Sequence, residues 1–550
     1  MFGLMMNAPL LVSSILRHAE AYHATTEIVS RTTEGPIHRY TYADLARRAK
    51  KVANALQRLG LKQGDRVGTL AWNGYRHLEL YFGSSGSGFV CHTINPRLFR
   101  EQISFIVAHA EDKVLFVDLS FVPILEAIAE TLKGLKAIVV MTDAANMPES
   151  GALPELVCYE TMIAGASDDF DWPVLDENAA SGLCYTSGTT GDPKGVLYSH
   201  RSTVLHAMAV ALPDVMSLSA VDAVSAIVPM FHVNAWGMPY AAPIVGAKLV
   251  MPGPKLDGES LHGLFEQEGV TMTAGVPTVW LGLLDWMDAH GKKFTSLKRV
   301  MIGGSAPPPV MITRFKKLGV DPRQGWGMTE TSPFGLASAL KAKHQSLPPD
   351  QKLPLEAKQG RPLFNVEFRV DGSDGKPIPR DGRSFGALLV RGPWVARRYF
   401  NSEPSPAHEV EGWFNTGDVV TMDEDGFVQI VDRTKDVVKS GGEWISSIEL
   451  ENIAQAHPSI KEAAVVGRPD ERWGERPVLV VQLKPGTNFS RDDLQELYTG
   501  KISKWSIPDD VVIVDELPHT ATGKLLKREI REIVLRDGSG RSPANEVTVN

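Results

Sequence analysis

CYTSGTTGDPKGVLYSH, residues 184–200, is the stretch of this chain that says most about its fold. A strand-like LCYT leads into a loop with three glycines, four hydroxyl side chains and Lys194, and an extended segment leaves it toward YSH. Glycines let backbone N–H groups turn toward an anion, hydroxyls donate hydrogen bonds, and the lysine adds positive charge. The pattern predicts a polyphosphate site; the alternative is a flexible surface loop. It is not a Walker A loop, because Pro193 precedes Lys194 and Gly195 follows it.

Helical and strand-like segments alternate around this loop, from Thr41 to about Gly246. Residues 42–60 carry apolar side chains at helical spacing and end on Gly60, a reasonable C-cap. Strands interleaved with helices predict α/β layers with mostly parallel sheets. Short β-rich runs occur at 64–72, 112–118, 135–141, 225–231 and 247–253.

The texture of the sequence changes after Pro362. Residues 362–431 hold short strands with frequent glycine, which predicts a small β-barrel or antiparallel sheet. After DRTKD (432–436) a last unit follows, with helices expected at 446–457 and 491–503 and strands at 461–468 and 476–484. We therefore expect an α/β protein with a large N-terminal domain, 1–432, of two α/β subdomains and the small barrel. A small α+β C-terminal domain would occupy 433–550.

Composition narrows the class of protein. A net charge of −8 argues against a nucleic-acid binder, which normally presents a basic face. Three cysteines fit neither a disulfide framework nor a metal knuckle, so a reducing interior is expected. The apolar N-terminus lacks a basic n-region and predicts a helix or extended arm rather than a signal peptide. No uninterrupted apolar run reaches about twenty residues. These features favour a cytoplasmic protein without a transmembrane segment.

Four further motifs follow the phosphate loop in order. They are GWGMTE (325–330), TGD (416–418), DRTKDVVKSGGEWIS (432–446) and TATGKLLKRE (520–529). Together with YTSGTTGDPKG (185–195) they resemble the signatures of the acyl-adenylate-forming, or AMP-binding, superfamily. That superfamily contains acyl-CoA synthetases, luciferases and peptide-synthetase adenylation domains. One departure is Trp326, where the family usually has tyrosine; an indole still offers a face on which adenine can stack.

The resemblance implies an ATP site. Thr186 and Glu330 would hold Mg²⁺, a hard cation that prefers oxygen ligands. Asp418 would accept hydrogen bonds from the ribose hydroxyls, with Arg433 beside the same sugar. The phosphate loop would contribute Ser187, Gly188, Thr189, Thr190, Gly191 and Lys194, and the adenine slot Gly304, Ser305, Ala306, Gly325, Trp326, Gly327, Met328 and Thr329.

The same resemblance implies two half-reactions in one site. Lys524 would contact the substrate carboxylate and the α-phosphate while the acyl-adenylate forms. A mobile C-terminal domain would then rotate about a hinge at Lys435 so that the thiol of coenzyme A can take the acyl group. In the rotated state the pantetheine tunnel would be lined by Lys439, Gly441, Gly442 and Trp444.

The identity of the acid rests on fewer residues. VPMFHVNAWGMPYAA (228–242), with residues 71–83 and 90–99, resembles bacterial medium- and long-chain fatty acyl-CoA synthetases. His232 would lie over the acyl carbon and Trp236 would gate the acyl tunnel; for both, the alternative is ordinary core packing. Ligases for 3-methylthiopropionate, a short sulfur-containing acid, have similar sequences. The subgroup also suggests a homodimer formed through the N-terminal lobe.

Other classes of protein stay open at this point. An adenylation enzyme that loads an amino acid onto a carrier protein would need an acidic residue where this chain reads FHVNAW, and no carrier domain follows. A catalytically dead nucleotide-binding relative is disfavoured because every expected charged position is filled. A luciferase-like oxygenase would need a specific luciferin. The sequence favours an ATP-dependent acyl-CoA ligase.

Overall fold

The computed structural model describes residues 1, 3–186, 192–372, 374–441, 443–519 and 525–537. The chain divides into two compact units. The first comprises Met1–Phe368, Val390–Phe414 and Asp425–Val428, and the second Arg369–Leu389, Asn415–Glu424 and Gln429–Asn550. The boundary expected between residues 432 and 433 stays a prediction, because one small sheet contributes strands to both units.

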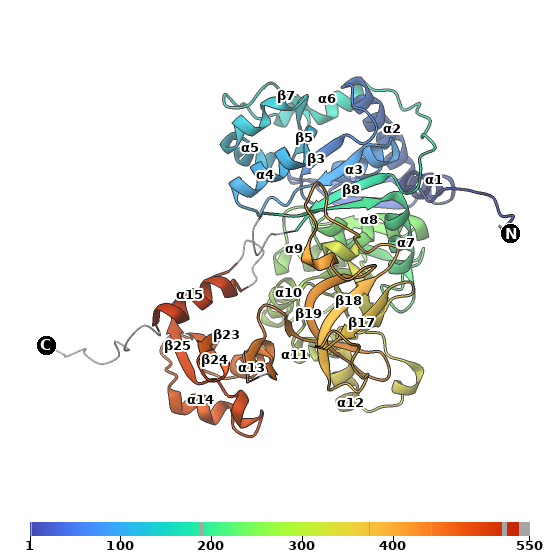
Figure 1. Ribbon diagram of the computed structural model, residues 1–550. Coiled ribbons are helices and arrows are strands. Elements are labelled where there is room, and N and C mark those ends of the chain that lie inside the picture. Colours follow the sequence, from blue (N-terminus) through green and yellow to red (C-terminus); the bar gives the residue numbers. More distant parts are fainter. Residues whose placement is uncertain (2, 187–191, 373, 442, 520–524, 538–550) are drawn as a thin grey trace. The chain divides into compact units, whose positions relative to one another are not determined.

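A seven-stranded sheet forms the first α/β layer of the large unit, in the order β7-β6-β5-β3-β4-β8-β9. Its pairs are parallel except for β8 and β9, so the expected mostly parallel arrangement is confirmed. Helices α4 and α5 cover one face of the sheet, and α2 and α6 cover the other (Figure 1). Their apolar side chains are packed against the strands. The strands are β3 (Arg66–Leu70), β4 (Val90–Thr93), β5 (Asp112–Val117), β6 (Ala137–Val140), β7 (Leu156–Cys158), β8 (Ala180–Tyr185) and β9 (Gly195–Ser199). The helices are α2 (Tyr42–Arg58), α4 (Arg100–Ala110), α5 (Val122–Ala127) and α6 (Tyr159–Ala164).

A nine-stranded sheet forms the second layer, in the order β16-β15-β14-β13-β12-β10-β11-β1-β2. Its inner pairs, from β14 to β1, are parallel, and α9, α10 and α11 bury Trp280 and Phe315 against one face. The strands are β1 (Glu27–Arg31), β2 (Ile37–Thr41), β10 (Ala223–Ala226), β11 (Lys248–Met251), β12 (Met272–Gly275), β13 (Arg299–Ile302), β14 (Asp321–Gly327), β15 (Phe334–Ala337) and β16 (Arg361–Pro362). The remaining helices of this unit are α1 (Val12–Tyr22), α3 (Tyr75–Gly86), α7 (His200–Ala211), α8 (Met238–Val245), α9 (Gly258–Glu268), α10 (Pro277–Ala289), α11 (Pro309–Lys317) and α12 (Pro349–Glu356).

The region 362–431 contains a four-stranded sheet in the linear order β17-β18-β19-β20. The second unit contains a five-stranded sheet, β22-β21-β24-β23, with β25 paired to β24. Alternate residues of β23 and β24 face α13 and α14 on one side and α15 on the other, which confirms the expected α+β lobe. The strands are β17 (Glu367–Asp371), β18 (Phe385–Arg391), β19 (Phe414–Met422), β20 (Val428–Arg433), β21 (Val438–Ser440), β22 (Glu443–Ile445), β23 (Ile460–Asp470), β24 (Gly474–Leu483) and β25 (Asp510–Val514). The helices are α13 (Ser447–Gln455), α14 (Arg491–Tyr498) and α15 (Lys527–Asp537).

Helix α2 shows how local sequence sets an element boundary. Thr41 and Asp44 form a capping box that satisfies N–H groups at the helix start. The chain leaves the helix at Leu59 and turns at Gly60, whose φ is +73°. The helix predicted over 42–60 is therefore confirmed.

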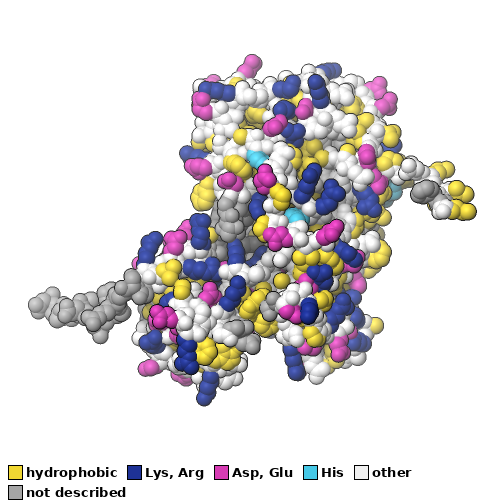
Figure 2. All heavy atoms as spheres, in the orientation of Figure 1, with side chains coloured by type: hydrophobic (Ala, Val, Ile, Leu, Met, Phe, Trp, Pro, Cys, Tyr) yellow, Lys and Arg dark blue, Asp and Glu magenta, His cyan; other side chains and the backbone are white. Residues whose placement is uncertain are grey.

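The surface of the protein mixes both charges. On the face drawn in Figure 2, basic and acidic side chains are interspersed. At the N-terminus, residues 3–11 precede α1 as an arm on which Leu4, Met5 and Met6 are exposed. Within the described part of the chain, no helix combines the length and apolarity needed to cross a membrane.

Asn73 links the two α/β layers. Its Nδ2 donates to the carbonyl oxygens of Ala226 and Val228 at 2.6 and 2.8 Å, and its Oδ1 accepts from the N–H of Met230 at 2.6 Å. Asn73 follows β3 and is 3% exposed. Because these backbone groups bond to a side chain from the other layer, β10 stops at Ala226 and the strand predicted over 225–231 is wrong in its second half.

Asn73→Ala should lower the stability of the first unit. The change leaves two carbonyl groups and one N–H buried without partners, which costs about 3 kcal/mol or more. Thermal unfolding followed by circular dichroism measures the loss. Asn54→Ala is the matched control, since its amide bonds to Ser167 and Asp169 at a solvent-accessible site. Equal melting temperatures for the two variants would contradict the linking role of Asn73.

Candidate active site

The phosphate loop is carried by the hairpin of β8 and β9. The last pair of the ladder joins Tyr185 to Gly195, and the N–H of Thr186 donates to the carbonyl of Lys194 at 2.9 Å. The N–H of Lys194 donates in turn to the hydroxyl of Thr186 at 3.2 Å. The structure therefore brings Thr186 and Lys194 together at the end of the hairpin where the loop connects the two strands. Ser187, Gly188, Thr189, Thr190 and Gly191 lie outside the described residues.

Glu330 is tied to this hairpin through two tyrosines. It sits in a short 3₁₀ turn after β14 and is 5% exposed. The hydroxyl of Tyr399 donates to its Oε1 at 2.7 Å, and the hydroxyl of Tyr198, on β9, donates to the carbonyl of Thr329 at 2.7 Å. The ammonium of Lys194 lies 4.9 Å from the ring centre of Tyr399. Thr186, Lys194 and Glu330 thus belong to one continuous set of contacts.

The chemistry of these side chains fits a divalent cation of the Mg²⁺ type. The carboxylate of Glu330 and the hydroxyl of Thr186 are hard oxygen donors, which such a cation prefers. Burial and the neighbouring Glu330 raise the pKa of Tyr399 well above its ordinary value, so its phenol stays protonated and donates. One oxygen of Glu330 is therefore held by a neutral donor.

The expected adenine loops leave neighbouring strands at the same edge. Gly304, Ser305 and Ala306 follow β13, Gly325 to Gly327 end β14, and these parallel strands pair with Ile302 opposite Gln324. Carboxyl ends of parallel strands meet at one edge, where nucleotides commonly bind. A Cβ on Gly327 would lie 1.8 Å from the carbonyl oxygen of Pro333, so only glycine fits there.

Trp326 lies among buried residues. Its ring packs against Gly335 and, in an edge arrangement with centroids 5.8 Å apart, against Phe368. It is 7% exposed. Met328 and Thr329 continue from this strand into the turn that carries Glu330. Stacking of adenine on Trp326 stays a prediction.

The segment after His232 has an unusual backbone. Val233, Asn234, Ala235, Trp236 and Gly237 all have positive φ, between 46° and 81°. Left-handed conformations cost non-glycine residues roughly 1 kcal/mol or more each. Contacts to the side chain of Asn234 help hold this left-handed turn: Tyr81 donates to its Oδ1 at 3.2 Å, and the Cys184 thiol lies 3.5 Å from the same atom.

The indole of Trp236 fills the space beside the adenine loops. It is 6% exposed, and its ring meets Phe334 edge-on with centroids 5.7 Å apart. A Cβ on Gly303 would lie 2.8 Å from the indole. His232, half-buried, begins the turn. The structure therefore brings His232 and Trp236 to the edge that carries Gly304 and Gly325.

The remaining candidate site residues belong to the second unit. Asp418, nearly buried, forms a 2.8 Å ion pair with Arg433, which agrees with a shared site. The carbonyl of Lys435 accepts from Arg531 at 2.6 Å, and burial lowers the pKa of Lys435. Lys439 and Trp444 face each other in the β21–β22 hairpin, with Gly441 at its turn. Gly442 and Lys524 lie outside the described residues.

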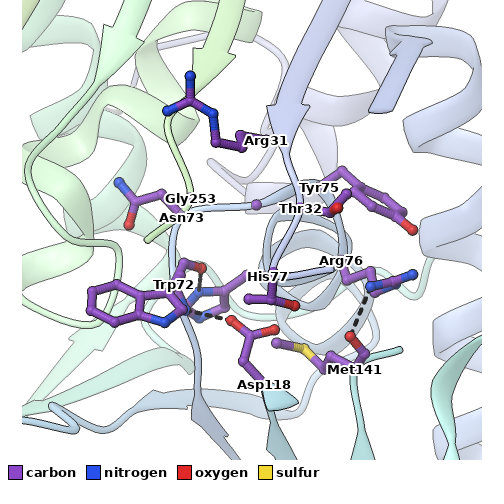
Figure 3. Close-up of a pocket in the computed structure, with 12 residues that line it drawn as sticks. Arg31, Thr32, Trp72, Asn73, Tyr75, Arg76, His77, Asp118, Met141 and Gly253 are labelled. Atoms are coloured by element: carbon purple, nitrogen blue, oxygen red, sulfur yellow. Dashed lines mark hydrogen bonds between the residues drawn. The ribbon is translucent and has the colours of Figure 1, made fainter. Parts of the chain in front are cut away.

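A small pocket lies at the carboxyl ends of strands from both layers (Figure 3). In Figure 3, Asp118 and His77 both point at the backbone of Trp72: the N–H of Trp72 donates to Asp118 at 2.7 Å, and Nδ1 of His77 lies 3.0 Å from the carbonyl. Burial raises the pKa of Asp118 to about 7 and lowers that of His77 to about 4. No motif indicated this pocket. The indole of Trp72 packs against Phe231, next to His232.

Comparison with known proteins identifies the class. Residues 15–400 match the family model described as AMP-binding enzyme, and residues 449–524 match its C-terminal domain. The chain is 52% identical to a 3-methylmercaptopropionyl-CoA ligase of Ruegeria lacuscaerulensis, over 97% of this chain and 98% of the relative. It is 50% identical to a medium-chain-fatty-acid–CoA ligase of Ectopseudomonas oleovorans, over 98% and 99%. The crystal structure of an anthranilate-CoA ligase with anthranoyl-AMP superposes with a TM-score of 0.82 at 25% identity, covering 97% and 99% of the two chains.

The chain therefore belongs to the AMP-binding enzyme family, as the motifs predicted. It is an AMP-forming acid–thiol ligase that makes an acyl-CoA through an acyl-adenylate. ATP and coenzyme A are its co-substrates. The α/β fold with a smaller C-terminal unit is likewise confirmed.

Asp118→Asn should change how stability depends on pH. The pKa of Asp118 is about 7 in the folded protein, against an ordinary value of 3.8, so the folded state keeps a proton that the unfolded state releases. The free energy of unfolding of the wild type should therefore fall between pH 4 and 7, by up to about 4 kcal/mol from this group. The neutral variant lacks that slope and should melt higher than the wild type at pH 8 but not at pH 4.5.

Melting temperatures across this pH range provide the test. Asp143→Asn is the control, because Asp143 is exposed and hydrogen bonds from Asn146 lower its pKa, so its removal should shift stability in the opposite sense. A higher melting temperature for the wild type than for Asp118→Asn at pH 8 would contradict a raised pKa of Asp118 in the folded protein.

Proposed function

We propose that the acid is a medium- to long-chain fatty acid, converted with ATP and coenzyme A to acyl-CoA, AMP and pyrophosphate. The observation that carries this proposal is the uncharged wall around the left-handed turn. Residues 228–242 contain no Asp, Glu, Lys or Arg, and Val233, Ala235, Trp236 and Met238 are almost fully buried there. An uncharged wall suits an apolar chain, because burying a charged substituent without a partner is costly. The medium-chain ligase among the relatives supports the same choice.

A short sulfur-containing acid is the second candidate. The Ruegeria relative, named for 3-methylmercaptopropionate, supports it. A thioether is also uncharged, so the same wall accepts it. An adenylation enzyme that loads a carrier protein is the remaining alternative, and it would need an acceptor other than coenzyme A.

Charge neutralisation and alignment are the protein's contribution to the first half-reaction. Thr186 and Glu330 would hold Mg²⁺, which would neutralise phosphate charge when bound. Lys194 would bind the β- and γ-phosphates together with Ser187, Gly188, Thr189, Thr190 and Gly191. Lys524 would contact the carboxylate and the α-phosphate. Asp418 and Arg433 would hold the ribose, and the loops at Gly304 and Gly325 the adenine. With ATP held at its phosphates, ribose and adenine, the carboxylate attacks the α-phosphorus in line and pyrophosphate leaves.

The second half-reaction needs different surroundings. The thiol of coenzyme A attacks the acyl carbon, the carbon–oxygen bond to AMP breaks, and AMP leaves with its electron pair. Lys524 must make room, so we propose that the C-terminal domain rotates about Lys435. Lys439, Gly441, Gly442 and Trp444 would then line the pantetheine tunnel.

Assembly and location follow the same resemblance. We propose a cytoplasmic homodimer formed through the N-terminal lobe. Light scattering after size exclusion should give twice the mass of one chain.

The acid is tested by a panel that runs from 3-methylthiopropionate and butyrate to octanoate, dodecanoate and palmitate. Each buried methylene contributes about 0.8 kcal/mol. For a fatty acyl ligase, kcat/KM should therefore rise roughly three- to four-fold per methylene until the tunnel is filled, beyond six carbons. A maximum at 3-methylthiopropionate with a fall beyond four carbons would establish the second candidate instead. Acid-dependent pyrophosphate release without acyl-CoA would indicate another acceptor.

Trp236→Ala tests the gate. In the proposed gate, the indole occupies the slot beside Gly303 in the nucleotide-free enzyme and leaves the acyl path when ATP binds. A non-hydrolysable ATP analogue should therefore strengthen binding of a fluorescent fatty acid to the wild type by at least about ten-fold. The variant should bind the acid without nucleotide and discriminate chain lengths less. Equilibrium titration measures both.

The control is Trp280→Phe, which changes a fully buried indole that belongs to α10 and packs against Gly275 rather than Gly303. It should lower stability and leave the nucleotide effect intact. If Trp236→Ala loses only the ~3–5 kcal/mol expected for emptying a buried Trp site, Trp236 is a packing residue and the gate is wrong.

A further inference from the structure

Tyr399 connects Lys194 and Glu330, two of the charged side chains that the motifs single out. Its hydroxyl donates to Oε1 of Glu330 at 2.7 Å, and its ring centre lies 4.9 Å from the ammonium of Lys194. Tyr399 is 7% exposed, so the hydroxyl bond is made where water competes little. It lies outside the five motifs quoted above.

The backbone around Tyr399 is fixed on both sides. The N–H of Ala396 donates to the carbonyl of Glu330 at 2.7 Å, and the N–H of Phe400 donates to the carbonyl of Gly195 at 2.8 Å. His109 completes the arrangement: its Nδ1 accepts from the hydroxyl of Tyr185 at 2.7 Å, which leaves Nε2–H to donate to the carbonyl of Asn401 at 3.2 Å. The segment 396–401 thus spans the phosphate hairpin and the turn of Glu330.

We propose that Tyr399 is a positioning residue for adenylation. Its hydroxyl orients the carboxylate of Glu330, and its ring face restrains Lys194. The proposal rests on the proposed function, in which Glu330 holds the divalent cation and Lys194 meets the phosphates.

The two effects have separate physical causes. A neutral donor on one oxygen of a carboxylate fixes the direction of the remaining lone pairs, as outer partners of metal ligands commonly do. A lysine, by contrast, is a flexible chain with a point charge, and an aromatic face attracts that charge without neutralising it. Removing the hydroxyl should affect cation binding, while removing the ring should also affect the polyphosphate.

Tyr399→Phe removes only the hydroxyl. The Mg²⁺ concentration needed for half-maximal binding of a fluorescent, non-hydrolysable ATP analogue should rise about ten-fold, as expected for losing a hydrogen bond to a charged group. At saturating Mg²⁺ the affinity for the analogue should stay within about two-fold, and the adenylation rate should recover toward that of the wild type, since the ring remains.

Tyr399→Leu removes the ring as well. At saturating Mg²⁺ it should bind the analogue a further three-fold or so more weakly, the size of an exposed cation–π contact. In a Glu330→Gln background, Tyr399→Phe should produce no further change, because the carboxylate it orients is gone.

Tyr159→Phe is the matched control. Tyr159 is another buried tyrosine whose hydroxyl donates to a carboxylate, Oε2 of Glu79, at 2.6 Å, but it lies in α6. It should lower the melting temperature as Tyr399→Phe does and leave the Mg²⁺ dependence unchanged.

An unchanged Mg²⁺ requirement in Tyr399→Phe would overturn the positioning role, and so would an equal rise in the Tyr159→Phe control. Failure of the proposed function would look different. The wild type would then make no acyl-CoA from any fatty acid, while the Mg²⁺ shift in Tyr399→Phe persisted.

Discussion

Repulsion between anions is the constraint on which the rest of the site depends. A carboxylate has to approach the α-phosphate of ATP, and the oxygens of the triphosphate also carry negative charge. The chain places the ammonium of Lys194 and the hydroxyl of Thr186 at the loop end of one hairpin, and the carboxylate of Glu330, the proposed cation ligand, next to them. Thr186 and Lys194 lie in the loop between β8 and β9 of one sheet, and Glu330 lies in a turn after β14 of the other. These residues are brought together only when the two sheets keep their relative position. Asn73, Tyr198 and Tyr399 supply connections of this kind.

The apolar part of the site answers a second constraint. In the proposed function an apolar acyl chain lies beside a highly charged nucleotide, so it needs uncharged surroundings near the nucleotide. The left-handed turn 233–237 carries uncharged side chains and places the indole of Trp236 against Gly303. Such a backbone is unfavourable by itself and survives because its polar groups are held from outside.

The sequence predicted those parts of the protein that depend on local chemistry. Helix α2 follows from its cap and apolar spacing. The motifs singled out Thr186, Lys194 and Glu330, which the structure brings together, and their binding of ATP and Mg²⁺ stays a prediction. The sequence did not predict Tyr399, whose partner Glu330 is 69 residues away along the chain. Asn73 is 157 residues from Met230, and its bonds shorten a strand that looked continuous in the sequence. Positive φ at Val233, Asn234, Ala235 and Trp236 contradicts local preference and arises from tertiary contacts alone.

The central claim is that the carboxylate attacks the α-phosphorus of ATP to form an acyl-adenylate. Octanoate labelled with ¹⁸O in both carboxyl oxygens tests this most directly, with the wild-type enzyme, ATP, Mg²⁺ and coenzyme A. In the predicted mechanism one labelled oxygen bridges to phosphorus and leaves with AMP when the thiol attacks. Mass spectrometry should therefore find one ¹⁸O in each AMP and none in pyrophosphate. Label in inorganic phosphate, with ADP as the nucleotide product, would contradict the account.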